Sequence, residues 1–189
     1  GEIPSFIYML VFAAIIIGTI AGWVTAKKVE MTKMPELVSL FNGMGGACAA
    51  LIGLLEFHHN VGKPGIIGII IAGMIIGSVS FSGSMIAWAK LNGTMKKAIR
   101  LPNYNMINNI VLLGLIIFGA YIPMSGTESQ VLLFTLFACS LIYGILFVIP
   151  IGGADMPVVI SLLNSFTGLA AAFGGFLYNN QVMLTGGIL

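Results

Sequence analysis

The chain has 189 residues, of which 58% are hydrophobic and only 7% are charged, and its formal net charge is +2. Soluble domains carry about 25% charged residues, so this composition excludes a soluble globular domain, a disordered chain and a nucleic-acid-binding protein. The two cysteines, Cys48 and Cys139, both lie inside apolar runs, which argues against a structural disulfide. The sequence therefore predicts an integral membrane domain surrounded by the lipid bilayer.

Apolar stretches of membrane-spanning length recur along the chain. A bilayer core of about 30 Å requires about 20 apolar helical residues. We therefore expect an all-α integral membrane protein, a bundle of six transmembrane helices plus the start of a seventh. In chain order the expected elements are Pro4–Ala26, Pro35–Phe57, Pro64–Ala89, Asn105–Met124, Ser129–Ile149, Pro157–Tyr178 and the apolar start Val182–Leu189. Residues 1–189 are expected to form a single transmembrane domain, a fragment of a longer chain.

The distribution of Lys and Arg predicts the orientation, because these residues are in excess on the cytoplasmic side. The loop between spans three and four and the loop between spans one and two carry most of them, and only Lys63 lies on the other side. The cations of the two basic loops are Lys27, Lys28, Lys33, Lys90, Lys96, Lys97 and Arg100. We therefore expect these loops, and the turn at residues 152–156, to face the cytoplasm.

The chain contains an internal repeat. Residues 34–46 and 156–168 align without gaps at an offset of 122 residues, and Asn42 aligns with Asn164. At the same offset Gly65-Ile66 falls on Gly187-Ile188, so spans one to three correspond to spans five to seven. Both copies enter the membrane from the same side, which predicts a parallel repeat. Its copies cover about residues 4–90 and 126–189, the second being truncated.

Small and polar residues form stripes on three of the spans. Helical periodicity places Ser39, Asn42 and Gly46 on one face of the second span, and their equivalents on one face of the sixth. Ser80 and Ser84 share a narrow face of the third. A buried amide in lipid needs hydrogen-bond partners, so the two asparagines predict a shared polar core able to hold water or an ion. Close helix packing alone is the alternative interpretation.

Ionisable residues are confined to the ends of the spans. Glu36 and Asp155 stand at the cytoplasmic starts of spans two and six, and Glu56, His58 and His59 at the outer end of span two. Charged groups at membrane depth are functional candidates, whereas helix-end electrostatics and solvated loops are the alternatives. No metal-ligand set or nucleophile–base pattern is evident. From the residues alone, proton or small-ion conduction, a secondary transporter or channel subunit, and a passive membrane anchor all remain open.

Three stretches resemble one family: residues 27–38 (KKVEMTKMPELV), 81–91 (FSGSMIAWAKL) and 150–168 (PIGGADMPVVISLLNSFTG). They are similar to the membrane domain of the β subunit of proton-translocating NAD(P) transhydrogenase, and the resemblance covers essentially the whole chain. It implies a complex in the bacterial inner membrane that couples inward proton flow to hydride transfer from NADH to NADP⁺. This segment would bind no cofactor and hold no hydride-transfer residue; soluble domains of the complete enzyme bind NAD(H) and NADP(H).

The resemblance also implies roles for individual residues. The proton path of the family falls on Ser84 and Asn164, and its span-two position falls on Asn42. Asp155 and Glu36 would couple the path to the NADP(H)-binding domain of the same β subunit.

Many family members carry a histidine where this chain has Asn42, and an asparagine cannot load and unload a proton. We therefore expect a membrane helix of the partner α subunit to supply the proton-carrying histidine. The alternative is that Glu56 or the His58–His59 pair, at an outer proton entry, feeds the path directly. A dimer of protomers is implied as well.

Overall fold

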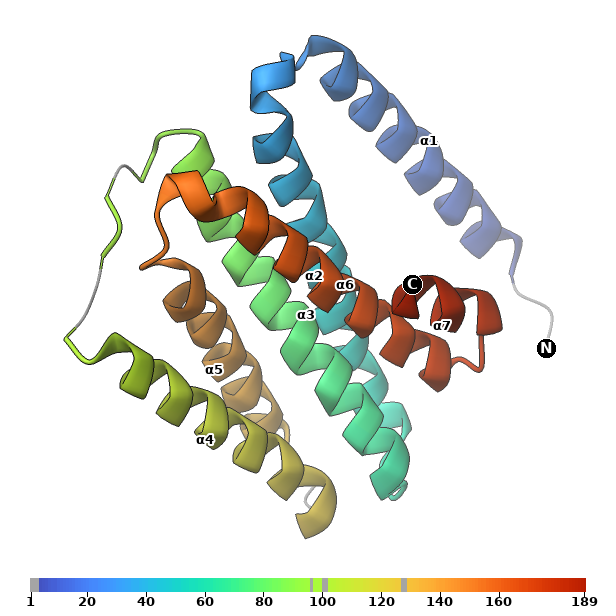
Figure 1. The fold of residues 1–189 in the computed structure, drawn as a ribbon. Helices are drawn as coiled ribbons and strands as arrows, with labels where there is room; N and C mark the ends of the chain where they lie inside the picture. Colours follow the sequence, from blue (N-terminus) through green and yellow to red (C-terminus); the bar gives the residue numbers. More distant parts are fainter. Residues whose placement is uncertain (1–3, 96, 100–101, 127–128) are drawn as a thin grey trace. The chain divides into compact units, whose positions relative to one another are not determined.

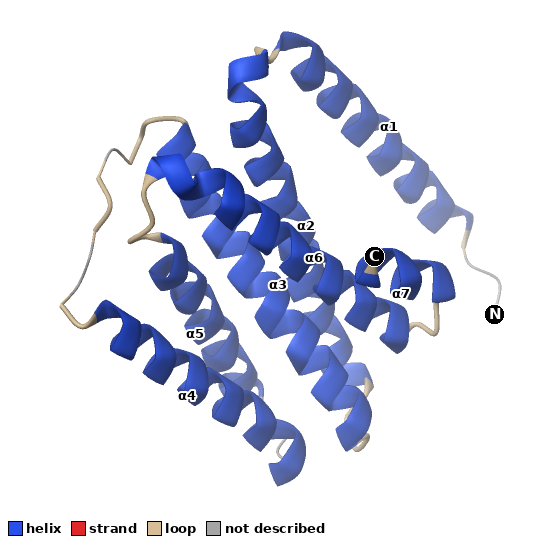
Figure 2. Cartoon of the chain, in the orientation of Figure 1, coloured by secondary structure: helices blue, strands red, loops and turns tan. Residues whose placement is uncertain are grey.

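The computed structural model describes residues 4–95, 97–99, 102–126 and 129–189. These residues are helical apart from short connections, and no strand occurs among them (Figure 2). Six helices are long and apolar enough to cross a membrane. The all-α class predicted from the sequence is therefore confirmed. Lys96 and Arg100, two of the cations used for the orientation, lie outside the described residues.

The helices begin and end within two residues of their expected bounds. They are α1 Ser5–Lys28, α2 Met34–His59, α3 Pro64–Leu91, α4 Tyr104–Ser125, α5 Gln130–Val148, α6 Met156–Leu177 and α7 Gln181–Ile188 (Figure 1). Prolines open α3 and α6, where the missing N–H costs no hydrogen bond. The side chain of Asn180 caps α7 by accepting hydrogen bonds from the backbone N–H groups of Val182 and Met183.

Two short 3₁₀ helices, which the sequence did not predict, provide further evidence for the internal repeat. Met31–Lys33 precedes α2 and Gly153–Asp155 precedes α6. Their bounds differ by the same 122 residues that relate the two sequence copies. The two copies therefore share the backbone geometry of the turn that leads into the helix, beyond the similarity of their side chains.

The chain divides into two compact units, residues 1–34 and residues 35–189. The first unit contains α1, a helix of 24 residues. In the second unit α3 is the central helix and packs against α4, α5 and α6 (Figure 1). One apolar cluster lies between α3, α4 and α5 around Met74 and Leu136, and another joins the ends of α3 and α5 to α6 around Ala87 and Met156.

Glycines allow α2 and α3 to approach closely. A Cβ built on Gly77 would lie 2.8 Å from the carbonyl oxygen of Gly46 and 2.9 Å from the backbone nitrogen of Ala50. No side chain larger than that of glycine fits such a contact without a shift of the backbone. Close approach of this kind is a common way to pack helices in membranes, where the hydrophobic effect between helices is absent.

The same contact recurs between α6 and α7, and it corrects the predicted register of the repeat. A Cβ on Gly187 would lie 2.5 Å from the carbonyl oxygen of Gly168 and 2.6 Å from the backbone nitrogen of Ala172. Gly168 and Ala172 are the equivalents of Gly46 and Ala50, so Gly187 corresponds to Gly77. The predicted alignment of Gly187 with Gly65 is wrong, because Gly65 has no neighbour within 4 Å of a Cβ position.

Candidate functional site

Asn42 is the centre of a polar network between α2 and α3. Its Nδ2 donates hydrogen bonds to the Oγ of Ser84 at 3.0 Å and to the Oγ of Ser80 at 3.3 Å. All three side chains are buried. Both amide protons are thus engaged, whereas Oδ1 accepts no hydrogen bond from the described part of the chain. Asn42 thus bonds to the two serines that the sequence places on one narrow face of the third span.

Ser80 connects this network to α6. Its Oγ lies 2.6 Å from the Oγ1 of Thr167, and the carbonyl oxygen of Leu163 is within reach of both hydroxyls, at 2.9 Å from Ser80 and 3.2 Å from Thr167. Each hydroxyl has one proton. Either hydroxyl can therefore donate to the carbonyl while the other donates to its neighbour, so the pair has two arrangements that satisfy every group.

Ser39 extends the network along α2. Its buried Oγ donates to the backbone carbonyl oxygen of Ser84 at 2.8 Å. We call Ser39, Asn42, Ser80, Ser84 and Thr167 the polar network. Its five side chains come from α2, α3 and α6, and none of them titrates near neutral pH. The network can therefore pass a proton between hydrogen-bonded groups, but it cannot store one.

Asn164, the predicted counterpart of Asn42, does not join the polar network. It is exposed and forms no hydrogen bond with another described residue. It lines a cleft of about 550 Å³ between α6 and α7, together with Thr167 and Gly187. The helical turn explains this: α6 points Leu163 and Thr167 toward α3, and Asn164 follows Leu163 by one residue, about 100° around the axis. Thr167 borders both the cleft and the network.

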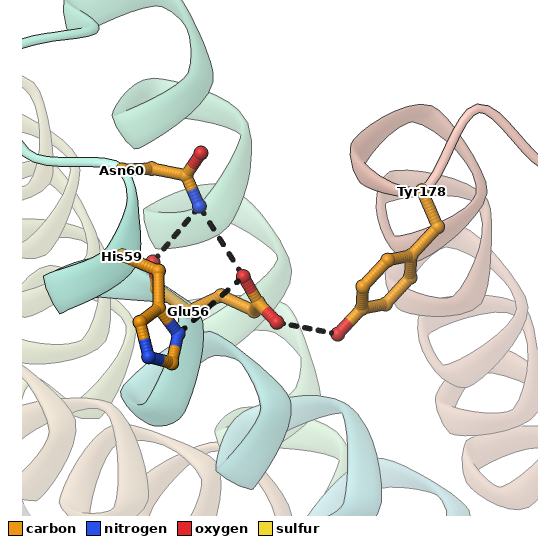
Figure 3. A network of polar contacts seen from close by, with 4 residues as sticks. All are labelled: Glu56, His59, Asn60 and Tyr178. Carbon is orange, nitrogen blue, oxygen red and sulfur yellow. Dashed lines mark hydrogen bonds and ion pairs between the residues drawn. The ribbon is translucent and has the colours of Figure 1, made fainter. Parts of the chain in front are cut away.

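Glu56, near the C-terminal end of α2, is the centre of a second polar group, which Figure 3 shows. Its Oε1 accepts a hydrogen bond of 3.0 Å from the hydroxyl of Tyr178, and its Oε2 accepts one of 3.2 Å from Asn60. The Nδ1 of His59 is 4.0 Å from Oε2. Burial, and then the hydrogen bond to the Glu56 carboxylate and its charge, raise the pKa of Tyr178. We call these four residues the Glu56 cluster.

The structure separates the two adjacent histidines. His59 belongs to the Glu56 cluster, whereas the Nε2 of His58 lies 3.1 Å from the Nε2 of Gln130 at the start of α5. No group of three His, Cys, Asp or Glu side chains that could hold a metal ion occurs among the described residues.

An apolar cavity of about 200 Å³ lies between the Glu56 cluster and the polar network. Leu177 and Gly53 line it at the Glu56 end, and Gly45 and Thr167 line it at the other. Leu177 precedes Tyr178 of the cluster, and Thr167 belongs to the network. The cavity therefore reaches the polar network at Thr167 and comes within one residue of Tyr178, but no residue of the Glu56 cluster lines it.

Asp155 and Glu36 lie outside both polar groups. Asp155 is exposed, closes the 3₁₀ turn before α6 and lines a surface cavity of about 870 Å³. Glu36 is partly exposed in the first turn of α2. Both acidic residues are thus placed at helix starts, as expected.

Sequence reasoning did not select Ser80 and Thr167 as site residues. Ser80 lies on the same predicted face as Ser84, and the family resemblance points only to Ser84. Thr167 follows Asn164 by three residues and sits just beside the stripe. The signal that could have identified Thr167 is its hydroxyl, which lies within one helical turn of the Asn164 side-chain amide.

Comparison with known proteins agrees with the motifs. Residues 2–189 match the family model described as NAD(P) transhydrogenase beta subunit. Two relatives, each named NAD(P) transhydrogenase subunit beta and both from Rhodospirillum rubrum, are 38% identical over 192 residues, covering 96% of this chain and 41% of the relative. The chain thus spans about two fifths of their length. With its membrane-spanning helices, its repeat and this match over nearly every residue, the chain belongs to the NAD(P) transhydrogenase beta subunit family.

Proposed function

We propose that this chain forms part of the proton-translocation path of a nicotinamide nucleotide transhydrogenase, which couples inward proton flow to hydride transfer from NADH to NADP⁺. The observation that carries the proposal is the polar network. Its hydrogen-bonded side chains are buried within membrane-spanning helices. Polar side chains in such helices are energetically unfavourable, and their presence is typical of functional sites.

The hydroxyl pair of Ser80 and Thr167 is suited to relaying a proton. When a proton arrives on one side and leaves on the other, the pair changes from one of its two arrangements to the other. No backbone movement is needed, because the carbonyl oxygen of Leu163 accepts in both. Thr167 also borders the cleft that Asn164 lines, so water in that cleft would meet the relay.

The titrating group at the centre of the path comes from outside this chain. Asn42 uses both amide protons within the network, and its Oδ1 is left as a hydrogen-bond acceptor. An imidazole N–H on a membrane helix of the α subunit is a suitable donor to that oxygen, and a histidine loads and unloads protons near neutral pH. Asn42 and Asn164 would order water around it.

The two ends of the path have different roles. At the outer face, the Glu56 cluster would deliver protons to the cavity that leads to Thr167. At the cytoplasmic face, Asp155 and Glu36 would contact the NADP(H)-binding domain of the same β subunit. The complete enzyme would be a dimer of protomers in the bacterial inner membrane, with NAD(H) and NADP(H) bound outside the membrane.

The proposal is tested in proteoliposomes of the complete complex, with a pH-sensitive dye inside and NADPH plus an NAD⁺ analogue outside. Acidification of the lumen during hydride transfer is the expected result. Asn164→Leu should abolish it while leaving nucleotide binding intact, whereas Asn109→Leu, an exposed position on α4, should not. Unchanged pumping in Asn164→Leu would remove that residue from the path. A wild-type complex that transfers hydride without moving protons would contradict the whole proposal and favour a passive anchor.

A further inference from the structure

Lys90 is a buried cation in the last turn of α3, 8% exposed. The sequence predicts that Lys90 is a loop cation, but the structure places it within the helix. Its Nζ donates to three backbone carbonyl oxygens, those of Val148 at 2.9 Å, Ile149 at 2.5 Å and Ile151 at 2.6 Å. An ammonium group has three protons, so all of its donors are used.

The three carbonyls explain how the charge is tolerated. Val148 is the last residue of α5, Ile149 caps the helix and Ile151 follows in the turn; the C-terminal carbonyls of a helix form the negative end of its dipole. The ion pairs found in the described residues do not include Lys90. The end of α5, rather than a carboxylate, therefore compensates the buried ammonium.

The carbonyls that Lys90 holds belong to the segment that leads to Asp155. After Ile151 the chain turns through Gly152, whose carbonyl accepts a hydrogen bond of 3.2 Å from the backbone N–H of Asp155. The next residue, Met156, is fully buried against Ala87 of α3. The position of Asp155 relative to α3 is thus fixed on both sides, by Lys90 before the turn and by Met156 after it.

The same helix carries the polar network. Ser84 precedes Lys90 by six residues, about 9 Å along a helix at 1.5 Å per residue. A rotation or shift of α3 caused by a change at Ser80 or Ser84 would therefore move the Lys90 ammonium and the carbonyls bound to it.

We infer that Lys90 is a positioning residue that transmits movement of α3 to the turn bearing Asp155, and so links proton passage to the state of the nucleotide-binding part. This inference rests on the proposed function and adds a residue to it. Coupling between two sites requires an element that both sites can bias, and α3 with its Lys90 contact is such an element.

The test uses the complete complex in proteoliposomes, with Lys90→Met, Lys90→Gln and Lys90→Arg. Lys97→Met is the matched control, because it removes the same charge from an exposed loop position near the same end of α3. Three quantities are measured: the protons moved per hydride transferred, the KM for NADPH, and the kcat of hydride transfer in detergent.

In Lys90→Met and Lys90→Gln, the protons moved per hydride should fall at least about fivefold and the KM for NADPH should change, with the detergent kcat within about twofold of wild type. Lys90→Arg should keep most of the coupling, and Lys97→Met all of it. If Lys90→Met does not assemble, Lys90→Gln against Lys90→Arg decides. Wild-type coupling in both Lys90→Met and Lys90→Gln would overturn the inference. An equal loss of kcat and of coupling in all three Lys90 variants would overturn it as well. A wild-type complex that moves no protons would instead refute the proposed function.

Discussion

Tyr178 donates a hydrogen bond of 3.0 Å to Glu56, and the two residues occupy equivalent positions of the internal repeat, 122 residues apart (Figure 3). Equivalent residues touch each other where two copies of a repeat meet. The C-terminal ends of α2 and α6 therefore come together at this pair, whereas α3 lies between them at the level of the polar network. A carboxylate in one copy and a phenol in the other make the contact asymmetric.

The Glu56–Tyr178 contact predicts a loss of stability at high pH. The pKa of Tyr178 is raised in the folded state, so its contribution is complete below the usual value of about 10 and is lost as the pH rises through the folded pKa. The Tm of the wild-type complex should therefore fall more than that of Tyr178→Phe between about pH 9 and about pH 11. Tyr121→Phe, an exposed tyrosine on α4, is the control. Parallel curves for wild type and Tyr178→Phe would contradict the prediction.

Glu56→Gln separates the structural role of this residue from a proton-carrying role. Glutamine keeps an oxygen that can accept from Tyr178, but it cannot bind and release a proton. We expect proton movement in proteoliposomes to slow by at least about tenfold, with the Tm nearly unchanged. His58→Gln should leave proton movement intact, because His58 contacts Gln130 and not the Glu56 cluster. Equal slowing in both variants would mean that the cluster is not the entry.

Gly77→Ala should destabilise the complex. A Cβ at this position would lie 2.8 Å from the carbonyl oxygen of Gly46 on α2, so the two helices must separate. The expected cost is about 1–3 kcal/mol, measured as a lower Tm or a lower unfolding midpoint in detergent. Gly68→Ala, on the same helix with no neighbour within 4 Å, should change stability by less than about 1 kcal/mol. If both variants behave alike, the close α2–α3 contact is not present in the protein.

Much of the fold could be predicted because helix length, proline position and charge are local properties. Every helix end agrees to within two residues. The register between helices could not be predicted in the same way. Gly187 contacts Gly168 because α6 and α7 pack closely in three dimensions. The connection between helices and the start of the following helix are longer in the first repeat copy, at α3, than in the second copy, at α7. A single constant sequence offset therefore cannot align the two copies.

The environment of single polar residues was also beyond the sequence. Asn164 and Thr167 are less than one helical turn apart and line the same cleft, yet only Thr167 is hydrogen-bonded to Ser80. Lys90 appeared to be a loop cation because its position at the end of a span is typical of topology-setting residues. Its three carbonyl partners come from the last residue of α5 and the turn after it, 58 to 61 residues away in sequence, and no periodicity indicates them.

The central claim is that the hydroxyl pair of Ser80 and Thr167 relays protons, and proton movement by Ser80→Ala tests it most directly. The control is Ser78→Ala, because Ser78 is equally buried on α3 and bonds only to Met74 within its own helix among the described acceptors. In proteoliposomes with NADPH and an NAD⁺ analogue outside, lumen acidification by Ser80→Ala should fall at least about tenfold, while Ser78→Ala stays within about twofold of wild type. Wild-type acidification by Ser80→Ala would contradict the account.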